Sequence, residues 1–481
     1  GYQSLGWSKS KEASKADYKA GQNVTISKTL TLYAVYKKLP YTVTFNNNNG
    51  TSTSKIYTSL TMYASKNQKV TLPDVPKVKG YTNLGWTTEK GETEPEYSAG
   101  DTVKITKATQ FYAVRRKSNY YTVSYYLGNG STNAAYQKLT QTVEEGTVVT
   151  FAKVPARTGY VNQGWSSKKN SEKATAKAKC TVNKNITLYA VQKKAVQLTF
   201  HRCDGSTWQK TTLAKGSSYS LPGVRDAEGY TFMGWSTKPM QSVSPQYEAE
   251  EKITVNGNVD LYAVVFNRTT ETDLTEDQLP QVDIYKYKQV IFVGDSRTEF
   301  MENVLTGMGE SATKNVKFVC SAGKGLDWFT TTGWAQLYSI VQHDSNSILS
   351  KKTAVIFNFG VNDLSKSADY AEYYNWIAPQ LKSKGCELYF MSVNPVNRLM
   401  LPNAGRADRS EAAVRSFNQY MKANLSSAYT YIDMYSYLKS TGYSFASDHY
   451  GTGTVDDGLH YTTRTYKRIF AKCMDSLRVP A

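Results

Sequence analysis

The chain has 481 residues, which is too long for one hydrophobic core and favours three or more domains of roughly 150 residues each. Its five cysteines are too few and too scattered for a disulfide framework, and no pair has the spacing of metal ligands, so we expect neither a disulfide-stapled fold nor a metal or other cofactor. No apolar run approaches the ~18–20 residues that span a bilayer, so we expect no membrane span in this sequence.

The net charge of +18 is concentrated in the first part of the chain. Residues 1–270 hold 36 Lys and Arg against 18 Asp and Glu, whereas residues 271–481 hold 22 of each. A cationic region joined to a neutral one indicates attachment of the first part to a polyanion and a separate task for the second. Nucleic acid is not the expected polyanion, because no recognition motif or basic helix accompanies the charge.

The first 268 residues consist of repeats. The pattern Gly-Tyr-x-x-x-Gly-Trp recurs at residues 1–7, 80–86, 159–165 and 229–235. Each copy closes with Leu or Phe followed by Tyr-Ala-Val, at residues 32–35, 111–114, 188–191 and 261–264. Opening strands with period-2 alternation precede the last three copies. The sequence therefore predicts the C-terminal part of one β-rich unit at residues 1–40 and whole units at 41–119, 120–195 and 196–268. Because the chain begins in the middle of the pattern, we expect it to be a piece of something longer.

This pattern resembles the Listeria-Bacteroides repeat, the B-repeat of internalin-type surface proteins. The resemblance implies small β-grasp-like modules strung in tandem on bacterial surface or secreted proteins, with binding or spacer roles and no catalysis. It places the protein outside the cell or on the surface of a bacterium, with Gram-positive bacteria favoured. Solvated loop charge is the default interpretation of the Lys and Arg runs. Summed over the units, the excess charge would hold the protein on teichoic acid or another anionic wall polymer. We expect the recurring aromatic residues to form cores rather than a platform for stacking sugars.

Residues 269–285 are polar and acidic, contain Pro280 and predict a linker. From residue 286 to 481, strand-like runs alternate with helix-like stretches. This alternation predicts a three-layer α/β domain with a mostly parallel, five-stranded, flavodoxin-like sheet. The expected strands are residues 290–293, 316–320, 353–359, 388–393 and 429–432, and the expected helices include 297–305, 368–384 and 407–424.

The turns after successive strands should converge on one edge of that sheet. Ser296 stands at the first strand-to-helix turn, where a helix N-terminus offers N–H groups to a developing anion. On this stretch alone, Ser296 is as well explained as a helix cap. A glycine-rich turn at 321–325, the block 360–363 and the block 456–460 complete the set.

Together these four blocks resemble the SGNH (GDSL-like) hydrolase family over roughly residues 287–478. The resemblance implies a serine hydrolase with Ser296 as nucleophile, His460 as base and Asp457 as the acid that orients it. Asp456 is a rival for that last role, with a less suitable spacing. It also implies oxyanion donors at the Ser296 N–H, at Asn362 and at Gly323, with Gly325 as the alternative to Gly323.

Two residues beside Ser296 are candidates for contact with substrate. Arg297 departs from the leucine of the family's name, so it binds an acidic or sugar substrate or pairs with a nearby carboxylate; Asp295 is the second candidate. Of the other histidines, His201 and His343 have no aspartate at triad spacing, and His449 directly follows Asp448, so that their side chains point apart.

These features predict a monomeric extracellular esterase that removes a short acyl group, such as acetate, from a polysaccharide. Two alternatives stay open: an O-acyltransferase acting on a cell-wall glycan, and an adhesin that binds glycans without turnover. The five cysteines, Cys180, Cys203, Cys320, Cys386 and Cys473, are expected to be mostly buried small hydrophobes.

Overall fold

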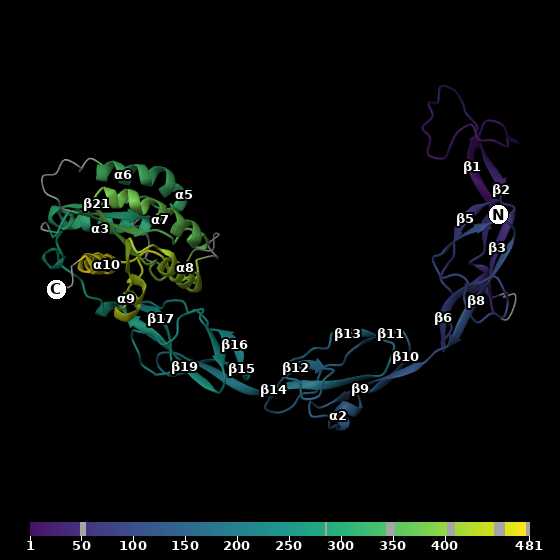
Figure 1. Cartoon of the computed structure of the whole chain (residues 1–481), viewed down its shortest axis with the longest axis horizontal. Coiled ribbons are helices and arrows are strands. Elements are labelled where there is room, and N and C mark those ends of the chain that lie inside the picture. The colour runs from purple at the N-terminus through teal and green to yellow at the C-terminus, as the bar shows by residue number, and fades with distance from the viewer. Residues whose placement is uncertain (49–53, 284–285, 343–351, 402–408, 447–456, 478–481) are drawn as a thin grey trace. The chain divides into compact units, whose positions relative to one another are not determined.

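The computed structural model describes residues 1–48, 54–283, 286–342, 352–401, 409–446 and 457–477 (Figure 1). The chain divides into two compact units. The first comprises residues 1–158 and 162–193, and the second comprises residues 159–161 and 194–481. Each unit is taken by itself below.

The first unit opens with the tail of one repeat, in which β1 (Tyr2–Ser8) and β2 (Tyr33–Lys38) pair antiparallel. The second repeat is a mixed sheet in the order β4-β3-β8-β6. In this sheet β3 and β8 run parallel and the other pairs antiparallel, which is a β-grasp-like arrangement. A small β5-β7 sheet packs beside it. The bounds are β3 (Tyr41–Asn47), α1 (Lys55–Thr58), β4 (Met62–Ala64), β5 (Gln68–Thr71), β6 (Tyr81–Thr87), β7 (Thr102–Ile105) and β8 (Thr109–Lys117).

The third repeat has the same plan. Its parallel pair is β9 with the first half of β14, and the antiparallel strands β10 and β12 flank this pair. Strand β14 is continuous, and its second half belongs to the fourth repeat. The bounds are β9 (Tyr120–Tyr126), α2 (Ala134–Gln137), β10 (Gln141–Glu144), β11 (Thr147–Thr150), β12 (Tyr160–Ser166), β13 (Lys179–Val182) and β14 (Ile186–His201).

The fourth repeat, in the second unit, keeps the parallel pair and replaces the short helix with a hairpin strand. The second half of β14 runs parallel to β19 and antiparallel to β15, and β17 pairs antiparallel with β19. The bounds are β15 (Thr207–Ala214), β16 (Ser217–Ser220), β17 (Tyr230–Ser236), β18 (Lys252–Val255) and β19 (Val259–Asn267).

Each whole repeat has a core of its own around the tryptophan of the recurring motif. Trp86 and Trp235 are fully buried and Trp165 nearly so. The glycine before the tryptophan is required by close packing: a Cβ at Gly85 would lie 2.2 Å from the backbone oxygen of Tyr97, at a φ of +154°. The recurring motif therefore builds the interior of the module, as expected.

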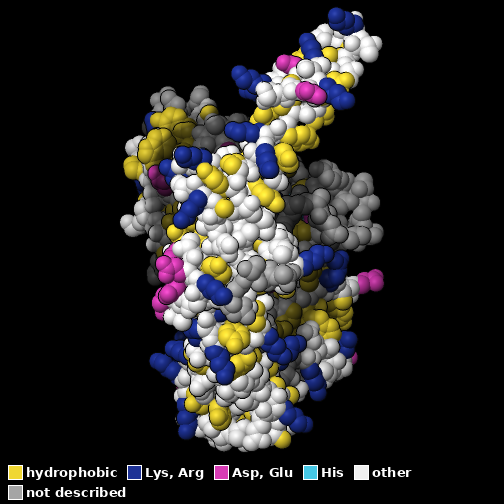
Figure 2. Space-filling model, turned by 90° about the vertical axis from the view of Figure 1, so that its right-hand side faces the viewer, with side chains coloured by type: hydrophobic (Ala, Val, Ile, Leu, Met, Phe, Trp, Pro, Cys, Tyr) yellow, Lys and Arg dark blue, Asp and Glu magenta, His cyan; other side chains and the backbone are white. Residues whose placement is uncertain are grey.

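The charged side chains of the repeats do not gather into one patch on the face shown in Figure 2. Lys and Arg side chains are spread there among hydrophobic and uncharged ones, with few Asp and Glu between them.

The α/β domain has a sheet of five strands, all parallel, in the order β21-β20-β22-β23-β24. This confirms the predicted fold class. The strands are β20 (Tyr287–Gly294), β21 (Val316–Cys320), β22 (Lys352–Asn358), β23 (Cys386–Met391) and β24 (Tyr429–Ile432).

Helices cover both faces of this sheet (Figure 1). Alternate residues of the strands feed the two cores: Ile291 and Val293 pack with α5 to α8, whereas Val290 and Phe292 pack with α3, α9 and α10. The predicted helix at 407–424 begins at Glu411, and residues 407 and 408 lie outside the described residues. The helices are α3 (Ser296–Met308), α4 (Glu310–Thr313), α5 (Leu326–Trp328), α6 (Trp334–Gln342), α7 (Ser367–Ser383), α8 (Glu411–Asn424), α9 (Met434–Thr441) and α10 (Thr463–Ser476), with a π-turn at Phe329–Gly333 and 3-10 turns at Arg268–Thr270, Glu276–Gln278 and Leu364–Lys366.

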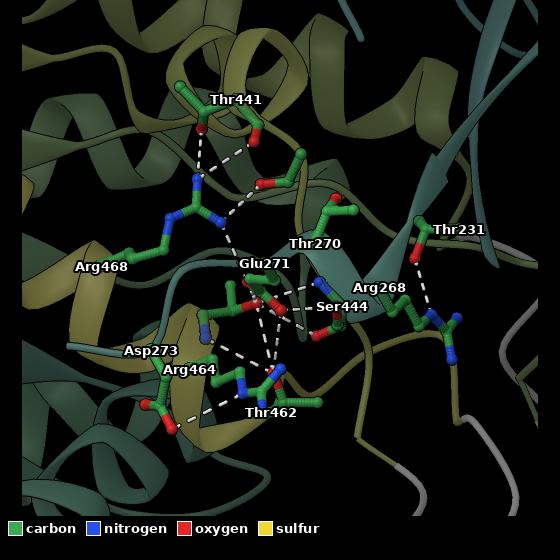
Figure 3. A network of polar contacts seen from close by, with 12 residues as sticks. Thr231, Arg268, Thr270, Glu271, Asp273, Thr441, Ser444, Thr462, Arg464 and Arg468 are labelled. Carbon is green, nitrogen blue, oxygen red and sulfur yellow. Dashed lines mark hydrogen bonds and ion pairs between the residues drawn. The ribbon is translucent and has the colours of Figure 1, made fainter. Parts of the chain in front are cut away.

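The acidic segment after the fourth repeat, interpreted from sequence as a linker, packs onto the α/β domain. Glu271 is buried and accepts hydrogen bonds from Ser444 and Thr465, and it forms an ion pair with Arg468 at 2.9 Å (Figure 3). Leu279 joins the core on the α3 side of the sheet. This segment therefore binds the end of the fourth repeat to the domain that follows it.

The fourth repeat also contributes side chains to that core. Met233, Val264 and Phe266 pack within it, and a Cβ at Gly442 would lie 2.2 Å from the Phe266 ring. The amine of Lys439 donates to the backbone oxygen of Met233 at 2.8 Å. The fourth repeat and the α/β domain therefore fold as one body, with a shared hydrophobic core.

Candidate active site

The first element of the site is the turn between β20 and α3. Strand β20 ends at Gly294 and helix α3 begins at Ser296, with the Asp295 carboxylate accepting a hydrogen bond from the Arg297 N–H at 3.0 Å. A Cβ at Gly294 would lie 2.0 Å from Thr298 Oγ1, so only glycine allows so tight a turn. Ser296 is thereby fixed at the carboxyl edge of the sheet, at the N-terminus of a 13-residue helix.

Three side chains form a continuous hydrogen-bonded relay at this edge. The Ser296 Oγ lies 2.9 Å from His460 Nε2, and His460 Nδ1 lies 2.6 Å from Asp457 Oδ2. Ser296 and His460 are 5% and 4% exposed and are thus shielded from water, whereas the Asp457 side chain keeps 16% exposure. The order of nucleophile, imidazole and carboxylate matches the arrangement that activates a serine for attack on an acyl carbon.

The turn that carries the imidazole is held by its own carboxylate. Asp457 Oδ1 accepts hydrogen bonds from the N–H groups of Leu459 and His460, both at 2.8 Å. Gly458 has a φ of +63°, and a Cβ there would lie 2.3 Å from the backbone oxygen of Asn397. Burial alone would raise the pKa of Asp457, but the hydrogen bond and charge of His460 outweigh burial and hold that pKa below its usual range.

The surroundings of the relay are apolar on one side. The Phe300 ring stands edge-on to the imidazole, with centroids 4.7 Å apart. Asp295 is 1% exposed, and this desolvation raises the pKa of its carboxyl to about 6 despite the nearby Arg297 charge. Asp295 therefore serves to cap α3, and its burial contradicts the expectation that it contacts substrate.

Arg297 is also buried, and its side chain is bonded within the protein. It is 2% exposed and donates to the backbone oxygens of Leu459, Asn394 and Pro395 at 2.9–3.0 Å. All three nitrogens of its side chain donate to carbonyl groups, and the expected pairing with a carboxylate is limited to the effect of its charge on the nearby Asp295. Contact of Arg297 with substrate stays a prediction. Its hydrogen bonds tie the start of α3 to the turn that carries His460.

The three predicted oxyanion donors lie in different settings. The Ser296 N–H belongs to the first turn of α3. Asn362 donates from Nδ2 to the Lys324 oxygen at 2.7 Å and accepts from Arg409, so it links the two glycine-containing turns. Gly323 is exposed, with a φ of +71°, and a side chain there would meet no neighbouring atom.

Gly325, the alternative to Gly323, occupies a tighter place. A Cβ there would lie 2.3 Å from the carboxylate of Asp363, which itself accepts from the Leu326 N–H at 2.9 Å and from Tyr370. Sequence reasoning missed Asp363 and Arg409 as supports of this edge. Asp363 stands directly beside Asn362 in a block already singled out, whereas Arg409 comes from a distant segment with no local signal.

Of the rivals named from sequence, Asp456, His343 and His449 lie outside the described residues. His201, in the fourth repeat, pairs with Asp260 at 2.8 Å. No helix within the described ranges is long and apolar enough to cross a membrane. All five cysteines are free thiols, of which Cys386 and Cys473 are buried and Cys203 is exposed.

Two family models match this chain. The Listeria-Bacteroides repeat domain matches residues 1–35, 41–114, 121–191 and 197–264, and the GDSL-like lipase/acylhydrolase matches residues 290–473. The matched ranges coincide with the recurring motifs and with the α/β domain, which confirms both resemblances drawn from sequence.

Two curated relatives come from Evansella cellulosilytica. One, named "Putative Gly-rich membrane protein", is 28% identical over 272 residues, which is 55% of this chain and 30% of the relative. The other, named "Putative membrane protein", is 27% identical over 220 residues, which is 44% of this chain and 31% of the relative. The chain thus spans about a third of the length of the curated relatives it matches.

Two solved structures are similar to part of the chain. A "putative acylhydrolase" from Bacteroides fragilis shares 16% identity with a TM-score of 0.28, covering 42% of this chain and 92% of that one. A "putative SGNH hydrolase" from Slackia heliotrinireducens shares 12% identity with a TM-score of 0.28, covering 40% of this chain and all of that one.

Proposed function

Because the chain belongs to the families of the Listeria-Bacteroides repeat and of the GDSL-like lipases and acylhydrolases, and is a serine ester hydrolase, we propose that it is an extracellular bacterial esterase that removes short acyl groups, such as acetate, from a polysaccharide. Ser296 is the nucleophile, His460 the general base and Asp457 the acid that orients the base. The observation that supports these roles is the buried relay itself, with 2.9 Å and 2.6 Å between successive groups.

In this reaction the Ser296 Oγ attacks the ester carbonyl while His460 Nε2 accepts its proton. The same imidazole then protonates the departing sugar hydroxyl, which leaves an acyl group on Ser296. A water molecule, deprotonated by His460, attacks this acyl-enzyme and releases the carboxylic acid. Asp457 stays ionised throughout and stabilises the imidazolium, which agrees with its lowered pKa.

The tetrahedral intermediates need donors for their oxyanion. We assign this role to the Ser296 N–H, the Gly323 N–H and the side chain of Asn362. An amide nitrogen carries two N–H groups, so Asn362 can donate to the oxyanion while it holds the Lys324 oxygen. Loss of one such donor typically costs about 3 kcal/mol of transition-state stabilisation, roughly a hundredfold or more in rate.

In this proposal the repeats hold the enzyme at the cell surface. Residues 1–270 hold 36 basic against 18 acidic residues, and this positive charge would attract an anionic wall polymer through a salt-sensitive interaction. The surface location is supported by the family of the repeats and by the names of the curated relatives as membrane proteins.

A fluorophosphonate probe and acetate release test the catalytic proposal together. Wild-type protein should be labelled by the probe and should release acetate from acetylated xylan, acetylated pectin or acetylated wall glycan, and Ser296→Ala should do neither. A folded wild type that the probe does not label would leave only the adhesin. Acyl transfer to an added sugar acceptor at the expense of free acetate would favour the acyltransferase.

Retention on immobilised anionic polymer tests the role of the repeats. Ser296→Ala protein should bind wall teichoic acid at about 20 mM salt and elute at about 500 mM, because the Debye length falls severalfold over that range. Binding that does not respond to salt would reject electrostatic attachment and leave the esterase assignment intact.

A further inference from the structure

The fourth repeat contains a cavity of about 220 Å³ that opens to solvent. Its aromatic lining includes Trp208, which is 39% exposed, and Trp235, which is fully buried; their rings lie nearly parallel, with centroids 5.8 Å apart. Phe232 packs edge-on against Trp235. The cavity is therefore a hollow in the fourth repeat whose lining includes two stacked indole rings.

The other whole repeats fill the corresponding space. In the third repeat, Tyr136 of α2 covers Trp165 edge-on and is 3% exposed, and in the second repeat Tyr57 of α1 is 6% exposed. The fourth repeat has no such helix, since β15 carries Trp208 in its place. Loss of the covering helix leaves the aromatic core accessible from one side.

Two substitutions remove polar groups that the other repeats place there. In the second repeat Arg115 bonds to Asn83 at 2.8 Å, and in the third Gln192 bonds to Asn162 at 2.7 Å. The matching positions of the fourth repeat are Val265 and Phe232, and both line the cavity. The floor is therefore apolar where the other repeats have a hydrogen-bonded pair.

The lining of the cavity includes two positively charged side chains. Arg202 and Arg225 are exposed, and each guanidinium carries five N–H donors. In the contacts found, each donates to the protein through Nη1 alone. Arg202 donates to Ser206 and Thr207, and Arg225 donates to the backbone oxygen of Leu399. The volume of about 220 Å³ lies below the roughly 300–1,000 Å³ of pockets for drug-sized ligands, so the cavity suits a single ring and not a long chain.

We propose that this cavity is a carbohydrate-binding site that takes one sugar ring of a glycan. The apolar face of a pyranose stacks on the exposed indole of Trp208, and its hydroxyl or carboxylate groups accept hydrogen bonds from Arg202 and Arg225. Flat aromatic faces with a few placed donors are the usual composition of small-ligand sites. The choice of a glycan rests on the proposed function, because the site shares one compact body with the esterase domain.

Calorimetric titration of the full chain tests this proposal without using esterase activity. The ligands are hexasaccharides of xylose, glucose, N-acetylglucosamine and galacturonate. We expect saturable one-to-one binding of at least one of them, a weakening of about 10-fold or more in Trp208→Ala, and no change in Trp376→Ala. Trp376 is the matched control because it is 60% exposed on α7 of the esterase domain.

A second variant and a second readout protect the test against misfolding. Val265→Gln restores the residue of the third repeat and should reduce binding by filling the floor. Cys203 is an exposed free thiol that lines the cavity, so a bound sugar should slow its alkylation by iodoacetamide. Absence of binding to all four hexasaccharides, binding that survives both substitutions, or protection of Cys203 by octanoate instead of a sugar would overturn the proposal.

Discussion

The second and third repeats differ from the fourth in the partner of one backbone carbonyl group. This difference shows how the fourth repeat is joined to the esterase domain. Val75 and Val154 have backbone oxygens that accept from the asparagine of their own repeat, Asn83 at 2.5 Å and Asn162 at 2.7 Å. The matching oxygen of Val224 accepts instead from Asn397 of the esterase domain, at 3.1 Å.

Asn397 makes two further hydrogen bonds, one to the fourth repeat and one within the α/β domain. Its Nδ2 also donates to Asp226 at 2.8 Å, and Asp226 forms an ion pair with Arg268 at the end of the repeat. Its backbone N–H donates to the oxygen of Gly458, inside the turn that carries Asp457 and His460. The earlier repeats complete their own polar networks, whereas the fourth completes its network with the catalytic domain. The same module thus serves as a self-contained unit in one place and as part of an enzyme in another.

The largest effect should come from the buried charges at this junction. Lys439 of α9 lies 2.8 Å from Glu248 of the fourth repeat and 3.0 Å from Glu411 of α8, and all three are largely buried. Lys439→Met removes the cation paired with two buried carboxylates and leaves Arg415 as the remaining nearby charge; loss of a buried ion-pair partner typically costs about 3–5 kcal/mol. Urea unfolding followed by tryptophan fluorescence should show this loss in the transition of the second unit.

An exposed ion pair in the same domain provides the control. Lys352 pairs with Glu387 at 2.7 Å but is 57% exposed, so Lys352→Met should cost less than about 1 kcal/mol. Equal losses in the two variants would mean that the junction charges are no more important than surface pairs. The fourth repeat would then be an attached spacer like the others.

The same network predicts how stability depends on pH. The neighbouring Glu411 and Glu248 overcome burial and raise the pKa of Lys439, so its contribution is complete below its unfolded value of ~10.4 and is lost as pH rises through the folded value. Burial alone would raise the pKa of Glu411, but Lys439 holds that pKa below its usual range. This contribution is therefore present above ~4.3 and lost as pH falls. Burial raises the pKa of Glu248, which partly offsets the acid loss.

Unfolding free energies of wild type and Lys439→Met measured across pH therefore test the network directly. Their difference should be greatest between about pH 5 and pH 10 and should narrow outside that range. A difference that stays constant from pH 3 to pH 11 would show that the variant loses packing and not charge pairing.

A smaller effect is expected on catalysis from Asn397. Asn397→Ala removes the link between the fourth repeat and the catalytic turn, and small misplacement of a catalytic group reduces rate steeply. We expect kcat to fall about 10-fold with KM nearly unchanged. The control is Asn375→Ala, whose side chain donates to the Asn424 oxygen on the other side of the domain. A change in KM alone would indicate a contact with substrate and not a positioning role.

The sequence predicted the parts of this structure that depend on local pattern. The apolar run at residues 290–293 predicted the strand that is β20 in the structure, and the position of Ser296 after it followed from the strand-to-helix turn. The three-residue spacing of Asp457 and His460 fits the turn in which the Asp457 carboxylate bonds both the backbone N–H and the Nδ1 of His460.

The errors concern contacts between distant segments. Arg297 binds oxygens that lie 97 to 162 residues away in sequence, and Glu271 binds partners 173 to 197 residues away. Arg297 was predicted as a possible substrate contact and Glu271 as part of a linker, but both are buried and hold distant segments together. No local pattern marks such partners, because polar residues look alike in sequence whether they face water or a buried carbonyl. The same reason explains why the fourth repeat looked like a copy of the others.

Removal of the first unit should have the smallest effect. A chain that starts at Lys194 keeps the second half of β14, which supplies the partners of β15 and β19, and keeps every described contact of Asn397, Lys439 and the catalytic relay. Its kcat/KM on a small soluble ester such as p-nitrophenyl acetate should therefore stay within about twofold of the full chain, because transition-state contacts are unchanged. A chain that starts at Asn267 instead loses the fourth repeat, exposes part of the shared core and should not fold stably. Full activity in that shorter chain would show that the fourth repeat is dispensable and would return it to the class of the other three.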